Sequence, residues 1–128
     1  MLRTFKDLKV WQKSYRLCVQ VYALSRQLPQ NERFELSSQL RRPAVSIPSN
    51  IAESYNRKTT NEYLQFLWIA SGSLGELETQ LMLSKNLGLC DEGAVAPVID
   101  STAELERMLK ALIRSLEKKQ QSALAPYP

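Results

Sequence analysis

The sequence predicts an all-α protein, an antiparallel four-helix bundle in which successive helices run up, down, up and down. Three observations favour this fold class. Apolar residues recur every three or four positions in four long stretches, the period of a helix with a buried face. Only 4 glycines occur among 128 residues, and β-branched residues are sparse outside short patches. The connections between the stretches are short, which makes consecutive helices antiparallel neighbours.

The first predicted helix, about residues 6–28, carries two adjacent apolar stripes. One contains Leu8, Trp11, Tyr15, Cys18 and Tyr22, and the other contains Val10, Leu17, Val21, Leu24 and Leu28. A surface helix of a monomeric bundle needs only one such stripe. We therefore expect this helix to bury one stripe in its own bundle and the second against a further partner.

The second predicted helix, about residues 32–55, contains Pro43 and Pro48 in its interior. Each proline removes a backbone N–H and costs about 3 kcal/mol in an unsupported helix. We therefore expect neighbouring helices to hold this helix, bent at its prolines. Polar residues form one stripe of it, and buried polar groups need hydrogen-bond partners. The predicted structural polar network, whose alternative is a ligand site, contains Arg41, Arg42, Ser46, Asn50, Glu53, Ser73 and Glu76.

The third predicted helix begins after Thr59, which fits a capping box with Glu62, and ends near Leu87 because Gly88 follows. Its first stripe, spaced as in a bundle, contains Tyr63, Leu67, Ala70, Leu74, Leu77 and Leu81. Its second stripe contains Trp68, Gly72, Gly75, Thr79 and Met82. An interior glycine costs about 1 kcal/mol relative to alanine, so we expect another backbone to approach closely at these glycines.

The fourth predicted helix spans about residues 93–119, with Pro97 in the first turn, where proline is tolerated. Its stripe contains Val95, Val98, Thr102, Leu105, Leu109, Leu112 and Leu116. Residues 120–128 show no apolar period. The predicted organisation is one domain, residues 1–119, followed by a flexible tail, residues 120–128.

The net charge of +4 is unevenly distributed along the chain. Residues 1–26 carry +5, residues 27–59 carry +2, residues 60–106 carry −7 and residues 107–119 carry +4. In an up-and-down bundle, the starts of the first and third helices meet the ends of the second and fourth at one end, which we call the basic pole. Asp91 and Glu92 fall at the other end, which we expect to be more acidic.

The basic pole is the candidate nucleic-acid contact, because clustered cations attract phosphate backbones. Its predicted contact residues are Arg3, Lys6, Lys9, Lys13, Arg57, Lys58, Arg114, Lys118 and Lys119. In the alternative interpretation, the cations at helix C-termini complement the helix dipoles and the others are ordinary solvated charges.

The composition disfavours an enzyme, and we expect no catalytic residue, no cofactor and no metal. Histidine, the commonest general base and a common metal ligand, is absent. Carboxylate-bridged metal sites in bundles use Glu-x-x-His pairs, and no glycine-rich phosphate loop occurs. No apolar run is long enough to span a membrane, and the N-terminus lacks the apolar core of a signal peptide, so we expect a cytoplasmic protein with free cysteines.

Several motifs together resemble one known family, from about residue 5 to 118. They are Phe5-Lys6-Asp7-Leu8-Lys9-Val10-Trp11, Leu28-Pro29 before Glu32, Gln39-Leu40-Arg41-Arg42, Ser46-Ile47-Pro48-Ser49-Asn50-Ile51-Ala52-Glu53 and Gly72-Ser73-Leu74-Gly75-Glu76-Leu77-Glu78-Thr79-Gln80-Leu81. They resemble the four-helix-bundle proteins encoded by intervening sequences in bacterial 23S ribosomal RNA genes. Ser54 departs from the glycine usual in that family, and Pro43 from a small non-proline residue.

The resemblance implies a bundle that assembles into a ring-like homopentamer. It also implies relatedness to the accessory protein of diversity-generating retroelements, a basic pentamer that works with a reverse transcriptase and nucleic acid. Our functional prediction is a non-enzymatic homo-oligomer that associates with nucleic acid, RNA or DNA, through the basic pole. The alternative is a scaffold that docks a partner protein without binding nucleic acid.

Overall fold

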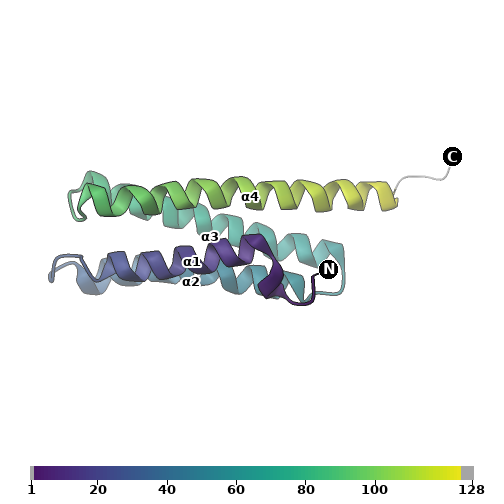
Figure 1. Ribbon diagram of the computed structural model, residues 1–128, viewed down its shortest axis with the longest axis horizontal. Helices are drawn as coiled ribbons and strands as arrows, with labels where there is room; N and C mark the ends of the chain where they lie inside the picture. Colours follow the sequence, from purple (N-terminus) through teal and green to yellow (C-terminus); the bar gives the residue numbers. More distant parts are fainter. Residues whose placement is uncertain (1, 125–128) are drawn as a thin grey trace.

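A computed structural model shows the four helices side by side along one long axis, and it describes residues 2–124 (Figure 1). A short 3-10 helix η1 (Phe5–Asp7) precedes α1 (Lys9–Ser25), α2 (Arg33–Tyr55), α3 (Thr60–Asn86) and α4 (Glu92–Leu124). No strand occurs within residues 2–124, so the all-helical prediction is confirmed. Each helix packs against two others in the cyclic order α1, α2, α3, α4, and the pairs α1–α3 and α2–α4 lie diagonally across the core.

The core consists of one apolar stripe from each helix. Leu17, Ile47, Leu77 and Leu105 are each at most 1% exposed and represent α1, α2, α3 and α4 respectively. On α4, the predicted stripe holds down to Leu109, but then Ile113 is buried while Leu112 is only partly buried. A straight helix drifts by about 20° per heptad, so a strict heptad pattern moves off the core after several turns.

The N-terminal part of the chain forms a capped turn before α1. The Thr4 hydroxyl accepts a hydrogen bond from the Lys6 backbone N–H, and the Asp7 carboxylate accepts bonds from the N–H groups of Arg3 and Thr4. The bond from the Lys6 N–H to the Thr4 hydroxyl is 3.1 Å long, and the bond from the Arg3 N–H to the Asp7 carboxylate is 2.8 Å long. The predicted first helix is therefore divided, and α1 begins three residues later than predicted, at Lys9 rather than Lys6.

The ends of α3 follow the predicted capping chemistry. The Thr59 hydroxyl accepts a hydrogen bond of 3.1 Å from the Glu62 backbone N–H. At the other end, Gly88 adopts a φ of 69°, and the N–H groups of Gly88 and Leu89 bond to the carbonyls of Lys85 and Ser84. This pair of bonds is a Schellman motif, which satisfies carbonyls that the helix end leaves free.

Helix α4 is longer than predicted, because it continues to Leu124 instead of ending at Lys119. Gln120 donates a hydrogen bond of 2.9 Å to the side-chain oxygen of Asn61, at the start of α3. Glutamine, lysine and alanine are good helix formers, so the helix persists without an apolar stripe. In Figure 1 the last turns of α4 extend beyond the other three helices. Residues 125–128 of the predicted tail lie outside the described residues.

Helix α2 runs from Arg33 to Tyr55 with both prolines inside it. Pro43 is buried, and packing by α1 and α3 supports the helix where its own hydrogen bonding is interrupted. The bend at the prolines stays a prediction. No helix within residues 2–124 combines the length and the apolar character needed to cross a bilayer.

Candidate nucleic-acid interface and assembly surfaces

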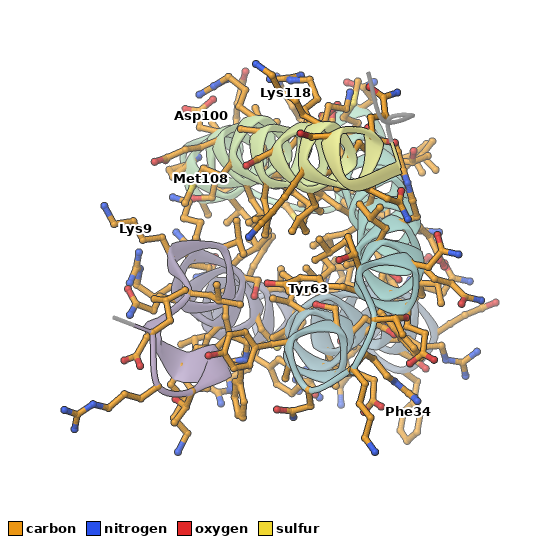
Figure 2. All side chains as sticks on the ribbon, turned by 90° about the vertical axis from the view of Figure 1, so that its right-hand side faces the viewer. Lys9, Phe34, Tyr63, Asp100, Met108 and Lys118 are labelled. Atoms are coloured by element: carbon orange, nitrogen blue, oxygen red, sulfur yellow. The ribbon has the colours of Figure 1, made fainter. Side chains whose placement is uncertain are left out.

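The residues of the predicted basic pole lie at the end of the bundle that faces the viewer in Figure 2, where α1 begins and α4 ends. Lys9 and Lys118 point away from the bundle on two different sides of it. All nine predicted residues are exposed except Lys13, which is partly buried. Because Lys9 and Lys118 lie on different sides of this end, the cations do not form a single pocket.

Two of the nine cations are already paired with carboxylates. Lys13 donates a hydrogen bond of 2.8 Å to Glu104, which joins α1 to α4, and this bond lowers the pKa of the Glu104 carboxyl. Arg57 lies 2.6 Å from the Glu53 carboxylate, one helical turn earlier, and its guanidinium stacks 4.5 Å from the centroid of the Phe66 ring. These two residues are less available to an external phosphate than the others.

The remaining seven cations make no ion pair within 4.0 Å in the part of the chain that is described. They are Arg3, Lys6, Lys9, Lys58, Arg114, Lys118 and Lys119. The opposite end is mixed in charge, because Arg33 at the start of α2 is as exposed to water as Asp91 and Glu92 near the start of α4. Lys85 further lies 3.8 Å from Glu92.

Three residues of the predicted polar network come together between α2 and α3. The hydroxyl oxygens of Ser46 and Ser73 are 2.8 Å apart. The Asn50 side-chain amide donates to the Ser46 carbonyl at 2.8 Å and to the Ser46 hydroxyl at 2.9 Å. This small cluster crosses the helix–helix contact, so it can fix how α2 lies against α3.

The other four residues do not join that cluster. Glu53 is exposed and pairs with Arg57, because its long side chain reaches water near the end of α2. Arg41 turns towards α1, where its Nε donates a hydrogen bond of 2.9 Å to the Ser25 hydroxyl. Arg42 and Glu76 are both exposed and line the same surface hollow, without an ion pair between them. The expectation that Glu53 is buried is therefore wrong.

The two stripes of α1 differ in burial as the doubled pattern predicted. Leu17, Val21 and Leu24 belong to the core, whereas Tyr15 of the other stripe is 54% exposed. That second stripe and α2 line an aromatic groove of about 640 Å³, which includes Trp11, Tyr15, Cys18, Tyr22, Val45 and Pro48. Burial raises the pKa of the Cys18 thiol, so it stays protonated and apolar at neutral pH. We call this surface the α1–α2 groove.

The outer face of α3 is unusually poor in charge. Its exposed residues from position 61 to 83 are Asn61, Gln65, Trp68, Ile69, Gly72, Gly75, Glu76, Thr79, Met82 and Leu83, among which Glu76 is the single charge. Trp68, Ile69 and Met82 are 45–51% exposed. The exposed face of α4, by contrast, consists mostly of charged residues such as Asp100, Arg107 and Lys118. A helix face that only meets water is normally charged, as on α4. The α3 face lacks this charge and exposes large apolar residues, so it is suited to contact with another molecule.

The glycines of this face lie in open space. Apart from adjacent residues and the backbone of α3 itself, no atom of residues 2–124 lies within 4 Å of the position where a Cβ would stand at Gly72 or Gly75. The predicted close backbone approach is therefore not made by residues 2–124 of the same chain. The glycines leave a flat, open strip between Trp68 and Met82.

Several features of these surfaces had no local sequence signal. The pair of Lys13 and Glu104 joins residues 91 positions apart. The buried hydroxyls of Ser14 and Ser25 bond to carbonyls of their own helix, so these serines sit in the core although neither belonged to a predicted stripe. No group of three or more His, Cys, Asp or Glu within residues 2–124 is placed to hold a metal ion.

Comparison with known proteins agrees with this architecture. The structure shares its fold with a crystal structure of a protein of unknown function from the S23 ribosomal protein family of Bacteroides thetaiotaomicron VPI-5482. The TM-score is 0.76 at 24% sequence identity, over 81% of this chain and 97% of that one. No curated protein matches the chain. The family described as 23S rRNA-intervening sequence protein matches residues 6–111. The chain therefore belongs to the 23S rRNA-intervening sequence protein family.

Proposed function

We propose that the chain is a non-enzymatic protein that assembles into a homo-oligomer, and that this oligomer associates with RNA through its basic pole. The observation that carries the proposal is the outer face of α3, where large apolar residues flank two glycines and only one charge occurs. Such a face is costly in water and allows a neighbouring helix to approach closely. The pentameric state implied by the family resemblance is part of the proposal.

A second copy is the occupant that charge favours for this face. The α1–α2 groove belongs to the half of the chain in which residues 1–59 carry 11 basic and 4 acidic side chains. The α3 face belongs to residues 60–106, with 8 acidic side chains and 1 basic one. The α1–α2 groove on one copy and the α3 face on the next are both largely apolar, and the single charge of each, Arg26 in the groove and Glu76 on the face, is opposite in sign. Because the two surfaces are different, the contact is head-to-tail and builds a ring when its rotation closes.

Assembly would turn the weak phosphate attraction of one basic pole into useful affinity. Each exposed cation that neutralises a phosphate releases counterions, which makes binding fall steeply with salt. A ring repeats the same cations around its circumference, and several poles that bind one RNA raise the overall affinity through effective concentration. The seven cations without intramolecular ion pairs supply this surface.

The test combines light scattering with RNA binding on charge-reversed variants. Lys6→Glu/Lys9→Glu alters the pole, and Arg16→Glu/Arg107→Glu makes the same change in net charge at exposed positions elsewhere; neither variant breaks an ion pair among the described residues. We expect a multimeric mass for all three proteins and a loss of RNA retention at low salt in the first variant only. A monomeric mass for the unaltered chain would refute assembly. Equal RNA binding by the two variants would refute the basic pole.

A protein-docking scaffold is the second candidate function, favoured by the apolar residues beyond the glycine strip. Leu83 and Leu87, in the last turn and at the end of α3, are 47% and 68% exposed. A partner protein bound there would be captured from a host lysate equally well with and without nuclease treatment. Capture that disappears with nuclease supports the RNA-based proposal.

A further inference from the structure

A cationic hollow lies along the first three turns of α2, next to the end of α1, and we call it the arginine groove. Its volume is about 690 Å³, and the lining residues that matter here are Tyr22, Arg33, Phe34, Ser38, Arg41 and Arg42. No carboxylate lines this hollow. Glu35 and Glu76 line a neighbouring hollow, which shares Phe34, Ser38 and Arg42 with the arginine groove.

The three guanidinium groups of the arginine groove have no anionic partner among residues 2–124. None of Arg33, Arg41 and Arg42 makes an ion pair within 4.0 Å. All three line this hollow, Arg33 and Arg42 from its two edges and Arg41 from between them, and eight residues of helix separate Arg33 from Arg41 by about 12 Å. Arginines placed together without carboxylates favour a planar anion such as phosphate, and this spacing allows more than one phosphate to bind.

Arg41 is held in position by contacts that leave its outer edge free. Its Nε donates a hydrogen bond of 2.9 Å to the hydroxyl of the buried Ser25, and its guanidinium carbon lies 4.5 Å from the centroid of the Tyr22 ring. Ser25 in turn donates to the Tyr22 carbonyl at 2.8 Å. The plane of the guanidinium is therefore fixed, and its terminal amino groups remain available to a ligand.

Phe34 adds an aromatic surface to this cationic site. Its side chain is 93% exposed, the largest value among the exposed large apolar residues. Figure 2 shows it pointing away from the bundle, on the opposite side from Lys118. An exposed aromatic ring beside arginines is the combination that binds single-stranded nucleic acid, because unpaired bases stack on the ring while cations hold the backbone. A duplex keeps its bases stacked inside and gives Phe34 no partner.

We propose that the arginine groove binds a short single-stranded segment of RNA, with phosphates on Arg33, Arg41 and Arg42 and an unpaired base stacked on Phe34. The groove lies near the α1–α2 connection, at the opposite end of the bundle from the basic pole (Figure 1). The inference rests on the proposal that RNA is a partner, and it adds a second site with a different preference. The basic pole attracts any phosphate backbone, whereas this groove selects unpaired nucleotides.

The experiment measures fluorescence anisotropy of the full chain with two labelled probes, a 12-nucleotide oligouridylate and an RNA duplex of about the same length. Phe34→Ala should weaken oligouridylate binding by roughly 5- to 100-fold and leave its salt dependence unchanged, because stacking carries no charge. Phe34→Tyr should restore binding. Arg33→Gln/Arg42→Gln should lower the salt slope by about 1.4, since each phosphate contact on a single strand contributes about 0.7. Neither Phe34 variant should change duplex binding.

Lys118→Gln/Lys119→Gln serves as the matched control, because it removes the same number of charges at the other end of the bundle. That variant should weaken the binding of both probes. If it does not, the result contradicts RNA binding at the basic pole and leaves the test of the arginine groove unchanged. The groove is refuted when Phe34→Ala and the double arginine variant bind oligouridylate as the unaltered chain does. It is also refuted when the arginine variant changes the mass in light scattering but not the oligouridylate affinity, because the arginines then serve a contact between copies.

Discussion

Replacing the two glycines of the α3 face by alanine should stabilise one protomer and weaken the proposed assembly. In the protomer, both positions are exposed, neither has a positive φ, and no described atom outside the local backbone of α3 lies within 4 Å of the new methyl groups. The effect is therefore that of helix propensity, about 1 kcal/mol per substitution. Gly72→Ala/Gly75→Ala should raise the free energy of unfolding of the protomer by about 2 kcal/mol.

The same methyl groups act in the opposite direction where a second copy packs on the strip. Added methyl groups in a closely packed contact cost about 1–3 kcal/mol, and 1.4 kcal/mol corresponds to a tenfold change in a dissociation constant. We therefore expect the dissociation constant of the assembly to rise at least about fivefold in the double variant. Opposite signs for stability and assembly distinguish this mechanism from general damage to the fold.

The assay uses light scattering over a dilution series, with urea unfolding at concentrations where the chains are dissociated. Gly88→Ala is the control, because Gly88 has a φ of 69° that L residues adopt at a cost. It should lower protomer stability by about 1 kcal/mol and leave assembly unchanged. A double variant that keeps the mass of the unaltered chain over the whole series would show that the α3 face is not the contact.

Three further outcomes follow from particular contacts. The hydrogen bond from Lys13 lowers the pKa of the Glu104 carboxyl in the folded state. The stability that this pair contributes is therefore present above the pKa of Glu104 in the unfolded chain, and it is lost as pH falls through the pKa in the folded chain. Glu104→Gln should lower the urea midpoint at pH 7 but not at pH 2. Asn50→Ala should lower the free energy of unfolding by about 1 kcal/mol, because two hydrogen bonds to Ser46 disappear, and an unchanged urea midpoint would contradict this. Thr59→Ala should cost about 1 kcal/mol through loss of the α3 cap, whereas Thr59→Ser should keep most of the stability.

The helices could be predicted from the sequence because their buried faces repeat at helical spacing. Ala70, Leu74 and Leu77 of α3 are all at most 2% exposed, as their period predicts. The separate turn before α1 was not predicted, because the hydrogen bonds of Thr4 and Asp7, and not an apolar period, define it. The C-terminal end of α4 was not predicted correctly, because residues 120–124 continue the helix through their helix propensity and the hydrogen bond from Gln120 to Asn61.

The polar contacts were harder to predict, because they depend on how helices lie against one another. Periodicity placed Ser46, Asn50 and Glu53 on one stripe, but it could not show that Glu53 reaches solvent near the end of α2 and pairs with Arg57. Arg41 was expected to join the polar network of Asn50 and Glu53, whereas its partners Tyr22 and Ser25 belong to α1. The rotation of a long side chain towards one neighbour or the other is decided by packing, on which the period of the sequence carries no information.

The overhang of α4 has a consequence for the cations near its end. Backbone amides beyond the reach of α3 lack tertiary packing, so they should exchange with deuterium far sooner than those around Leu105 and Leu109. Lys118 and Lys119 thus sit close to a segment that frays readily. In the proposed RNA complex, fraying would let these lysines adjust to the path of the phosphates, and ordering this segment on binding would cost conformational entropy.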